Sequence, residues 1–193
     1  MTWQTKLEAG QVIAPSSLAT MRAPSRLADG VAIDYGLGTR MGTFDGHRVF
    51  GHTGGGGGFK SILESFPDDG VVIAILSNTE SASIAALAAR IARAVLGLPS
   101  HGHIDLQVPP DEANAIAGTF DSDEGPIEMS PCDGKLCFRS PDGKIRGTLE
   151  REAPFVYRVG GEEMVRFEQR AGPANWAFVY DAGLLADAKR RIR

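Results

Sequence analysis

His52 and Thr53 stand at the end of a short apolar stretch, and five consecutive glycines, residues 54–58, follow them directly. A glycine run inside a folded domain loses much backbone entropy and offers no side chain for packing, so it usually lets something approach the main chain closely. The polar pair beside this run favours a binding or catalytic site. The alternative is a flexible hairpin connection, because glycine-rich loops are common.

Cys132 and Cys137 are the only cysteines, too few for a disulfide framework and without the paired spacing of a zinc site. They flank Asp133-Gly134, a dipeptide typical of tight turns. A two-residue loop there would pair Cys132 with Lys135 rather than with Cys137. We therefore expect two buried or half-buried thiols.

The composition of the chain argues against several classes of binding partner. The 193 residues are 42% hydrophobic with a net charge of -4, which suits one good core or two modest ones. The balance of 20 basic against 24 acidic residues, without a basic-aromatic cluster, argues against nucleic acid. No apolar run reaches the roughly 18 residues of a membrane span, and no signal-peptide core follows Met1. His101 and His103 form an isolated H-x-H, which we expect in a loop, and no metal or cofactor is expected.

The first half of the chain predicts an antiparallel sheet with flanking helices. Residues 2–22 have the pattern of a helix, a break and a second helix. Turn sequences at Asp45-Gly46 and at 67–70 separate four expected strands: Val31 to Gly38, Arg48 to Thr53, Phe59 to Phe66 and Val71 to Ser77. A helix from Ser81 to Leu96 follows, ended by Gly97. This helix can cover only one face of the sheet, so the other face is expected to be uncovered.

The second half predicts a small all-β domain. Residues 99–112 are rich in proline and polar side chains and are expected to be a linker. Beyond them, short strands alternate with turns at roughly 8 to 12 residue intervals, which is typical of a barrel or sandwich. The basic end, 189–193, is expected to be frayed and solvated. The expected strands are Gly118 to Phe120, Ile127 to Ser130, Leu136 to Ser140, Ile145 to Glu150, Phe155 to Val159, Met164 to Gln169 and Asn175 to Tyr180.

Several motifs occur in the order found in a known family. They are Tyr35-Gly36-Leu37-Gly38, Gly51-His52-Thr53-Gly54-Gly55, Gly58-Phe59, Pro67-Asp68-Asp69-Gly70 and Leu76-Ser77-Asn78. In this order they resemble the C-terminal part of the β-lactamase and penicillin-binding-protein-like serine hydrolases. The resemblance implies an α+β fold for residues 1–98, closing a domain whose first half is absent. Residues 113–193 resemble, more loosely, the lipocalin-like barrels that follow some of these domains.

The resemblance assigns roles to the residues of the glycine-rich stretch. His52 matches the cationic or hydrogen-bonding position of a triplet at the edge of the active site, and Thr53 matches its substrate-holding hydroxyl. Gly54 matches a position where substrate lies against the strand. Gly55 would supply one backbone N–H group of the oxyanion hole. An acyl or peptide-like substrate is implied, and complete members of the family are often periplasmic or secreted.

The nucleophile motif of that family, Ser-x-x-Lys, is missing. The residues three positions before the five lysines are Trp3, Gly57, Cys132, Pro141 and Ala186. The near-match from Cys132 to Lys135 lies in an expected hairpin, so we do not expect it to act as nucleophile.

Three hypotheses follow. The chain is the C-terminal part of a serine acyl hydrolase that is inactive alone, a non-catalytic module that binds a ligand or partner in its barrel, or a partner that completes a separately encoded catalytic half. Under the first hypothesis, the uncovered sheet face predicts self-association.

Overall fold

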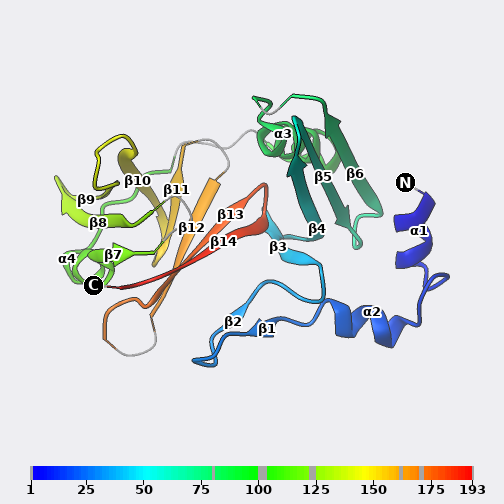
Figure 1. Ribbon diagram of the computed structural model, residues 1–193, viewed down its shortest axis with the longest axis horizontal. Helices are drawn as coiled ribbons and strands as arrows, with labels where there is room; N and C mark the ends of the chain where they lie inside the picture. The colour runs from blue at the N-terminus through cyan, green and yellow to red at the C-terminus, as the bar shows by residue number, and fades with distance from the viewer. Residues whose placement is uncertain are drawn as a thin grey trace. The chain divides into compact units, whose positions relative to one another are not determined.

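The computed structural model describes residues 2–79, 81–99, 104–121, 125–160, 163–169 and 172–192. The contacts divide the chain into two compact units (Figure 1). The first contains Met1–Ser100 with Asp181–Leu185, and the second contains His101–Tyr180 with Ala186–Arg193. Each unit has its own cluster of buried hydrophobic side chains.

The first unit contains a four-stranded antiparallel sheet in the order of the sequence. Two-residue turns join the first three strands, with positive φ at both central residues of Asp45-Gly46 and of Gly57-Gly58. Such turns match the twist of a hairpin, so their sequences fix the pairing of the neighbouring strands. The antiparallel sheet predicted from the turn sequences at Asp45-Gly46 and at 67–70 is confirmed. Its strands are β3 (Arg40–Phe44), β4 (His47–Gly56), β5 (Phe59–Phe66) and β6 (Val71–Ser77).

The predicted strand from Val31 to Gly38 is wrong. This segment holds only the short β2 (Ala32–Ile33), which pairs with β1 (Ser25–Arg26). The tight turn at 45–46 brings residues 40–44 opposite β4, so they form the first strand of the sheet instead. The backbone after Tyr35 turns to a helix end, where the Leu37 N–H donates to the Met21 carbonyl at 2.9 Å.

The described residues of the first unit form three helices. They are α1 (Thr2–Glu8), α2 (Pro15–Met21) and α3 (Ile84–Leu96), so the predicted helix, break and second helix are confirmed. The last helix, α3, ends at Gly97 with φ 69°, as the sequence predicts. Figure 1 shows α3 against the sheet formed by β4, β5 and β6. Buried alanines of α3, at 88, 89 and 92, belong to the same cluster as sheet residues such as Phe66 and Ile73.

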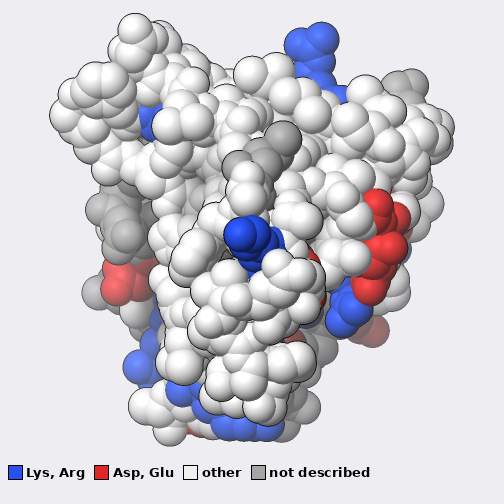
Figure 2. Space-filling model, turned by 90° about the vertical axis from the view of Figure 1, so that its right-hand side faces the viewer, with Lys and Arg blue, Asp and Glu red and all other residues white. Residues whose placement is uncertain are grey.

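The opposite face of this sheet is covered only in part. The Ser65 hydroxyl donates to Glu8 of α1 at 2.8 Å, and the Arg22 guanidinium lies 4.0 Å from the centre of the Phe50 ring. Farther along the same strands, Leu76 is 83% exposed and Phe59 is 62% exposed. Figure 2 looks from the side of Figure 1 where β6 and α1 lie, and most of the surface in view is uncharged, with separate groups of blue and red atoms. The predicted uncovered face is thus present beyond the end that α1 and α2 cover.

The second unit is an antiparallel barrel of eight strands that is nearly closed. Its strands follow one another in sequence order, and Phe120 and Arg191 form a bridge between its two edges. The all-β barrel predicted from the turn spacing is confirmed. A helix, α4 (Pro110–Ile116), packs with the barrel. The strands are β7 (Gly118–Phe120), β8 (Ile127–Cys132), β9 (Lys135–Arg139), β10 (Arg146–Ala153), β11 (Val156–Val159), β12 (Glu163–Glu168), β13 (Trp176–Asp181) and β14 (Leu184–Arg190).

Arg191, which lies in the basic end that the sequence predicts to be frayed, is held by the second unit instead. The Arg191 guanidinium donates to four backbone carbonyl groups, those of Ala174, Ala115, Ile116 and Ala117. Burial lowers the pKa of this guanidinium below its usual value. Carbonyl groups left over at the end of α4 supply the compensation, because the last carbonyls of a helix have no partner within it. Arg191 therefore fastens the last strand to α4 and to the first strand.

Much of the range expected as a linker is part of the second unit. The Leu106 N–H donates to the Arg151 carbonyl at 2.9 Å, and Val108 lies in the barrel core. The helix α4 begins at Pro110, where the missing N–H of proline is tolerated. Residues 104–112 thus contribute hydrogen bonds and buried surface to the barrel.

Cys132 and Cys137 form a disulfide, so the expected free thiols are wrong. The register is the one predicted, with Cys132 opposite Lys135, and Cys137 lies opposite Ser130. Two residues apart along one strand, Cys132 and Ser130 share a face, so the cysteines are diagonal neighbours. Their Cα atoms are 5.8 Å apart, a normal distance for a disulfide.

The structure also bears on membranes and metals. In the part of the chain that it describes, no helix has the length and apolar character needed to cross a membrane. Within the same residues, no three His, Cys, Asp or Glu side chains gather into a possible metal site. His101 and His103 lie outside the described residues.

Candidate substrate-binding edge

The strand that carries His52 extends beyond its neighbour on one side. The pairing of β3 with β4 ends at Arg40 opposite Gly51, whereas the pairing of β4 with β5 continues to Gly56 opposite Phe59. Among the strands that the structure describes, none pairs with residues 52–56 on the β3 side. Backbone N–H and C=O groups along such an edge can pair with an extended ligand.

His52 is exposed at the start of this edge and has two hydrogen-bond partners. Its Nδ1 lies 2.5 Å from the carbonyl oxygen of Thr53, and its Nε2 lies 3.0 Å from the hydroxyl of Tyr35. A carbonyl oxygen only accepts, so Nδ1 carries the proton in the neutral imidazole. The other nitrogen, Nε2, then accepts from the Tyr35 hydroxyl. The two rings meet edge to face, with their centres 5.8 Å apart.

The glycine run is part strand and part turn. Residues 54–56 continue β4, and Gly57-Gly58 form the turn into β5. A Cβ atom built at Gly54 would lie 2.7 Å from the Ser61 hydroxyl oxygen, whereas one at Gly55 would meet nothing nearer than 3.8 Å. The hairpin alternative for the run therefore explains Gly57 and Gly58. It leaves Gly55 without a steric reason.

A shallow hollow of about 420 Å³ lies over the neighbouring ends of β4, β5 and β6. Its lining combines three glycines of β4 with hydroxyl, ammonium and apolar side chains. Lys60 lies opposite Gly55 in the register, and its ammonium donates to the Ala82 carbonyl at 3.4 Å. The lining residues are Gly54, Gly55, Gly56, Phe59, Lys60, Ser61, Leu76 and Ser77.

The four residues singled out from the sequence lie in succession on β4 and alternate between its faces. His52 and Gly54 share the partly open face with Leu76, and Thr53 and Gly55 share the face of Ile62. Only a ligand that lies along the edge itself can contact side chains of both faces. Sequence reasoning missed the role of Tyr35, although its motif was part of the family pattern, because 17 residues separate it from His52.

Glu64 is a buried carboxyl group on β5, and its partner on β4 is the residue just before His52. It lies opposite Gly51 on β4, is fully buried, and among the described residues no donor reaches either of its oxygens. Burial, and then the negative charge of Asp181 in the same unit, raise the pKa of Glu64 to about 8. Glu64 is therefore mostly protonated at neutral pH.

The near-match to a nucleophile motif has no nucleophile. Cys132 is held in the disulfide, and the Lys135 ammonium is paired with the Asp105 carboxylate. A thiolate is the reactive form of cysteine, and a disulfide sulfur has none. Residues 132–135 are thus a hairpin turn of the barrel.

Comparisons with known proteins agree with this fold. Residues 3–96 match the family model described as Beta-lactamase, so this part of the chain is similar to the β-lactamase family. No curated protein matches the chain. Two solved structures of SurE, one with D-Leu, have TM-scores of 0.51 at 23% and 24% identity and cover 92% and 93% of this chain. An octameric penicillin-binding protein homologue from Pyrococcus abyssi has 14% identity and a TM-score of 0.45, and covers 97% of this chain.

The chain spans less than half of each of these solved structures. It covers 44% and 42% of the two SurE chains and 44% of the Pyrococcus abyssi chain. At such identities the two SurE structures show a shared fold and nothing more.

Proposed function

We propose that the edge of β4 from His52 to Gly56 binds the substrate of a serine acyl hydrolase. The observation that carries this proposal is the extension of β4 beyond β3, with a histidine at its start and glycines along it. The kinship of residues 3–96 with the β-lactamase family supports it. The substrate is an acyl compound such as a β-lactam, a peptide or an ester.

The edge can contribute binding and charge stabilisation. An extended substrate beside residues 52–56 would exchange backbone hydrogen bonds with the strand. The Gly55 N–H is proposed as one donor to the oxyanion that develops on the attacked carbonyl. His52, oriented by Tyr35, would bring the charge of its imidazolium form beside that carbonyl, and the Thr53 hydroxyl would hold the substrate from the other face.

The 193-residue sequence contains no Ser-x-x-Lys, so a nucleophile and its base must come from elsewhere. Without them, the edge alone supplies only a remnant of the rate. We expect the chain by itself to perform no covalent acyl transfer. Intact-mass analysis after exposure to a fluorogenic penicillin and to an activated ester checks this, and a stoichiometric adduct on a serine would overturn it.

The role of His52 can be tested in the protein joined to its natural upstream sequence. His52→Ala should lower turnover of the ester by about 10- to 1000-fold, the range found when one stabilising donor is lost. The thermal midpoint should barely change, because the side chain is exposed and packs little. His47→Ala is the matched control, since His47 lies on the same strand and pairs with Asp69.

Two outcomes of this experiment contradict the proposal. A destabilised His52→Ala protein with full activity per folded molecule would make His52 a structural residue. An equal loss of turnover in His47→Ala would show that β4 as a whole, and not its open edge, is sensitive to substitution.

The choice of substrates can be widened by one comparison. One of the SurE structures is described with D-Leu. We therefore include peptides with a D-amino acid beside the penicillin and the ester. Faster turnover of the D-peptide than of its L-counterpart would favour a peptidase over a lactamase or esterase.

The open part of the sheet face is proposed as a surface that further protein covers. Exposed Leu76 and Phe59 lie there, and large apolar patches are uncommon on isolated soluble proteins. The chain alone should associate with itself at micromolar concentration, and Leu76→Glu should reduce this in light scattering. A monodisperse monomer that binds no apolar dye would remove the proposal.

A further inference from the structure

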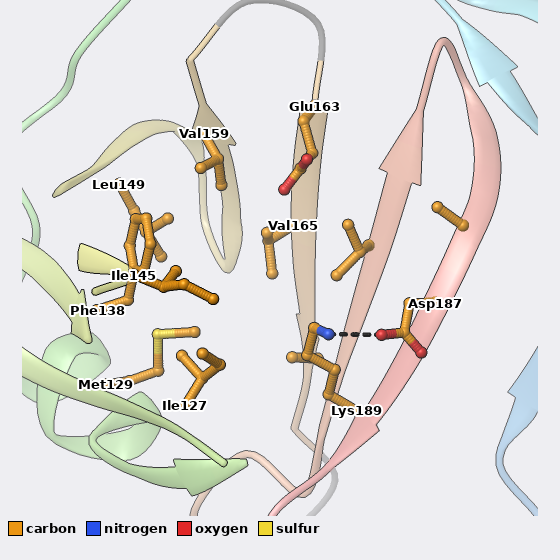
Figure 3. Close-up of a pocket in the computed structure, with 13 residues that line it drawn as sticks. Ile127, Met129, Phe138, Ile145, Leu149, Val159, Glu163, Val165, Asp187 and Lys189 are labelled. Carbon is orange, nitrogen blue, oxygen red and sulfur yellow. Dashed lines mark hydrogen bonds and ion pairs between the residues drawn. The ribbon is translucent and has the colours of Figure 1, made fainter. Parts of the chain in front are cut away.

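The barrel of the second unit has a pocket in its interior. Its volume is about 400 Å³, in the size range of small-molecule sites (Figure 3). Ten of the thirteen lining residues are hydrophobic, and most of these ten belong to the buried core of the barrel. The other three are Glu163, Asp187 and Lys189. The walls are therefore mainly those of a site for an apolar molecule.

The sequence explains why only part of the interior is filled. Phe120, Tyr157 and Phe167 pack edge to face in the barrel core, and none of them lines the pocket. The strands that border the pocket present short side chains instead, including Ala177 and Ala186. Small barrels are filled where their inward residues are large, and they hold a ligand where these residues are small.

A glycine shapes one wall of the pocket. Gly147 on β10 lies directly opposite Phe138 on β9, and a Cβ atom built at Gly147 would lie 2.9 Å from the Phe138 ring. The ring therefore rests against bare backbone, a position that any larger residue at 147 would disturb. In this position the ring forms a flat apolar wall of the pocket.

The charged groups of the lining already have partners. The Lys189 ammonium donates to the Asp187 carboxylate at 2.5 Å, and the Ala188 N–H donates to the other oxygen of that carboxylate at 2.7 Å. Glu163 also interacts with another group. In the part of the chain that the structure describes, no buried polar side-chain atom of the lining lacks a hydrogen-bond partner. A charged ligand would therefore lose hydration beside apolar walls without meeting a group that needs it.

We propose that this pocket binds a neutral, apolar small molecule of about ten to sixteen carbon atoms. The size follows because an apolar cavity of about 150 Å³ holds one benzene molecule, and this pocket is roughly two to three times larger. The molecule contacts Met129, Phe138 and Val165 and carries no charged end. This site is independent of the edge of β4, so each proposal stands or falls separately.

Fluorescence of a neutral apolar dye, N-phenyl-1-naphthylamine, bound to the full chain tests the proposal. Naphthalene, 1-naphthoate and 1-naphthylmethylammonium then compete with the dye, since they share one apolar body and differ in charge. Naphthalene should bind about tenfold or more tighter than either ion, because each ion would have to give up hydration in the pocket. Benzene should bind about tenfold or more weakly than naphthalene, since it buries fewer carbon atoms.

A pair of matched variants assigns the binding to the pocket. Ile145 lines the pocket, is 37% exposed, and in Figure 3 points toward the open space that the labelled side chains surround. Ile145→Asp should weaken naphthalene about tenfold or more, because it places a charge on an apolar wall. Ile104→Asp makes the same change at a side chain of the same unit that is 47% exposed and does not line the pocket, and it should keep the affinity. Circular dichroism checks that both variants fold.

A further control separates the pocket from the exposed face of the sheet. Leu76→Glu alters that face in the other unit, so it should leave dye binding to the barrel unchanged. A dye signal that is lost in Leu76→Glu and kept in Ile145→Asp would place the dye on the sheet and overturn the pocket.

Measurements on the parent chain decide the proposal without any variant. Its thermal midpoint should rise with naphthalene, because ligand binding stabilises the folded state, and calorimetry should show a negative heat-capacity change on binding. Equal or tighter binding of either ion would overturn the neutral ligand. No dye binding, or no displacement by naphthalene, would overturn the pocket itself.

Discussion

Among the described residues, each unit buries one carboxyl group in its core, and the surroundings of the two carboxyl groups differ greatly. Glu112 in the barrel unit accepts hydrogen bonds from the Arg151 guanidinium at 2.8 and 3.0 Å, from the Tyr157 hydroxyl at 2.6 Å and from the Phe155 N–H at 3.0 Å. Glu64 in the sheet unit has no such donor among the described residues. One carboxyl is a satisfied ion and the other is a neutral acid.

The pKa values follow from these surroundings. Burial alone would raise the pKa of Glu112, but the hydrogen bonds from Arg151, Tyr157 and Phe155 outweigh it and hold that pKa below its usual range. Burial, followed by the hydrogen bond to ionised Glu112, raises the pKa of the Tyr157 hydroxyl. At Glu64 nothing opposes burial, and the pKa rises to about 8.

The two units differ in how completely their polar groups are paired within the unit. In the barrel unit, Glu112 and Arg191 form hydrogen bonds with other groups of the same unit, and a disulfide links Cys132 with Cys137. The sheet leaves a buried acid, a strand edge and an apolar face without partners in the described chain.

The largest effect is expected from removal of Glu112. Glu112→Ala would leave the Arg151 guanidinium buried without its partner, which typically costs about 3–5 kcal/mol of unfolding free energy. Chemical denaturation followed by circular dichroism measures the loss. The matched control is Glu128→Ala, whose exposed pair with Arg139 should matter far less. Similar losses in the two variants would show that the Glu112 network is not special.

A smaller effect is expected from Glu64→Gln, and it depends on pH. The folded-state pKa near 8 lies above the usual 4.5, so only the unfolded chain releases this proton between the two values. Unfolding free energy should therefore fall as pH rises from 4.5 toward 8, by at most about 1.4 kcal/mol per pH unit. Between pH 6 and pH 7.5 the loss is about 2 kcal/mol, and Glu64→Gln should abolish most of it.

The measured quantity is the slope of the unfolding free energy against pH. Denaturation curves for both proteins at four pH values give the dependence, and Glu128→Gln serves as a control for the loss of one carboxyl group. A parent protein whose stability is flat over this range has an ionised or solvated Glu64, and the contrast with Glu112 disappears.

The sequence predicts the parts of this fold that local chemistry determines. Turn dipeptides such as Asp45-Gly46 and Asp133-Gly134 gave the hairpins, and helical spacing with Gly97 gave α3. Long-range partners have no local signal: the four carbonyls that bind Arg191 lie 17 to 76 residues away. The disulfide was not predicted, because the expected register places Cys132 directly opposite Lys135, whereas the two cysteines are diagonal neighbours.

The candidate site likewise has features that the sequence predicts and features that it does not. His52, Thr53, Gly54 and Gly55 could be named because they follow one another in a motif, and their roles stay predictions. The bare edge could not be predicted, because it depends on where β3 ends. The hydroxyl of Tyr35 reaches His52 only through the path of the chain between α2 and β3.

The disulfide offers a third way to sharpen the contrast. Cys132→Ser with Cys137→Ser opens a short loop in the barrel, and loop-closure entropy puts the cost at about 2 kcal/mol. The thermal midpoint of the parent should fall on adding reductant, and that of the double variant should not respond. No other cysteine exists to confuse the result. A parent protein indifferent to reductant would mean that the barrel does not depend on this bond.

The smallest effect is expected from the neighbour of Glu64. The negative charge of Asp181 is the second cause of the raised pKa, after burial, so Asp181→Asn should lower that pKa without restoring it to 4.5. The fall of stability with pH should end at a lower pH than in the parent, and should still be present. Asp111→Asn, an equal change of charge at an exposed position on α4, should leave the profile as it is. If Asp181→Asn flattens the profile completely, repulsion between two carboxylates rather than burial sets the pKa of Glu64. The sheet unit would then hold a coupled acid pair, and Glu64 would no longer be the counterpart of Glu112.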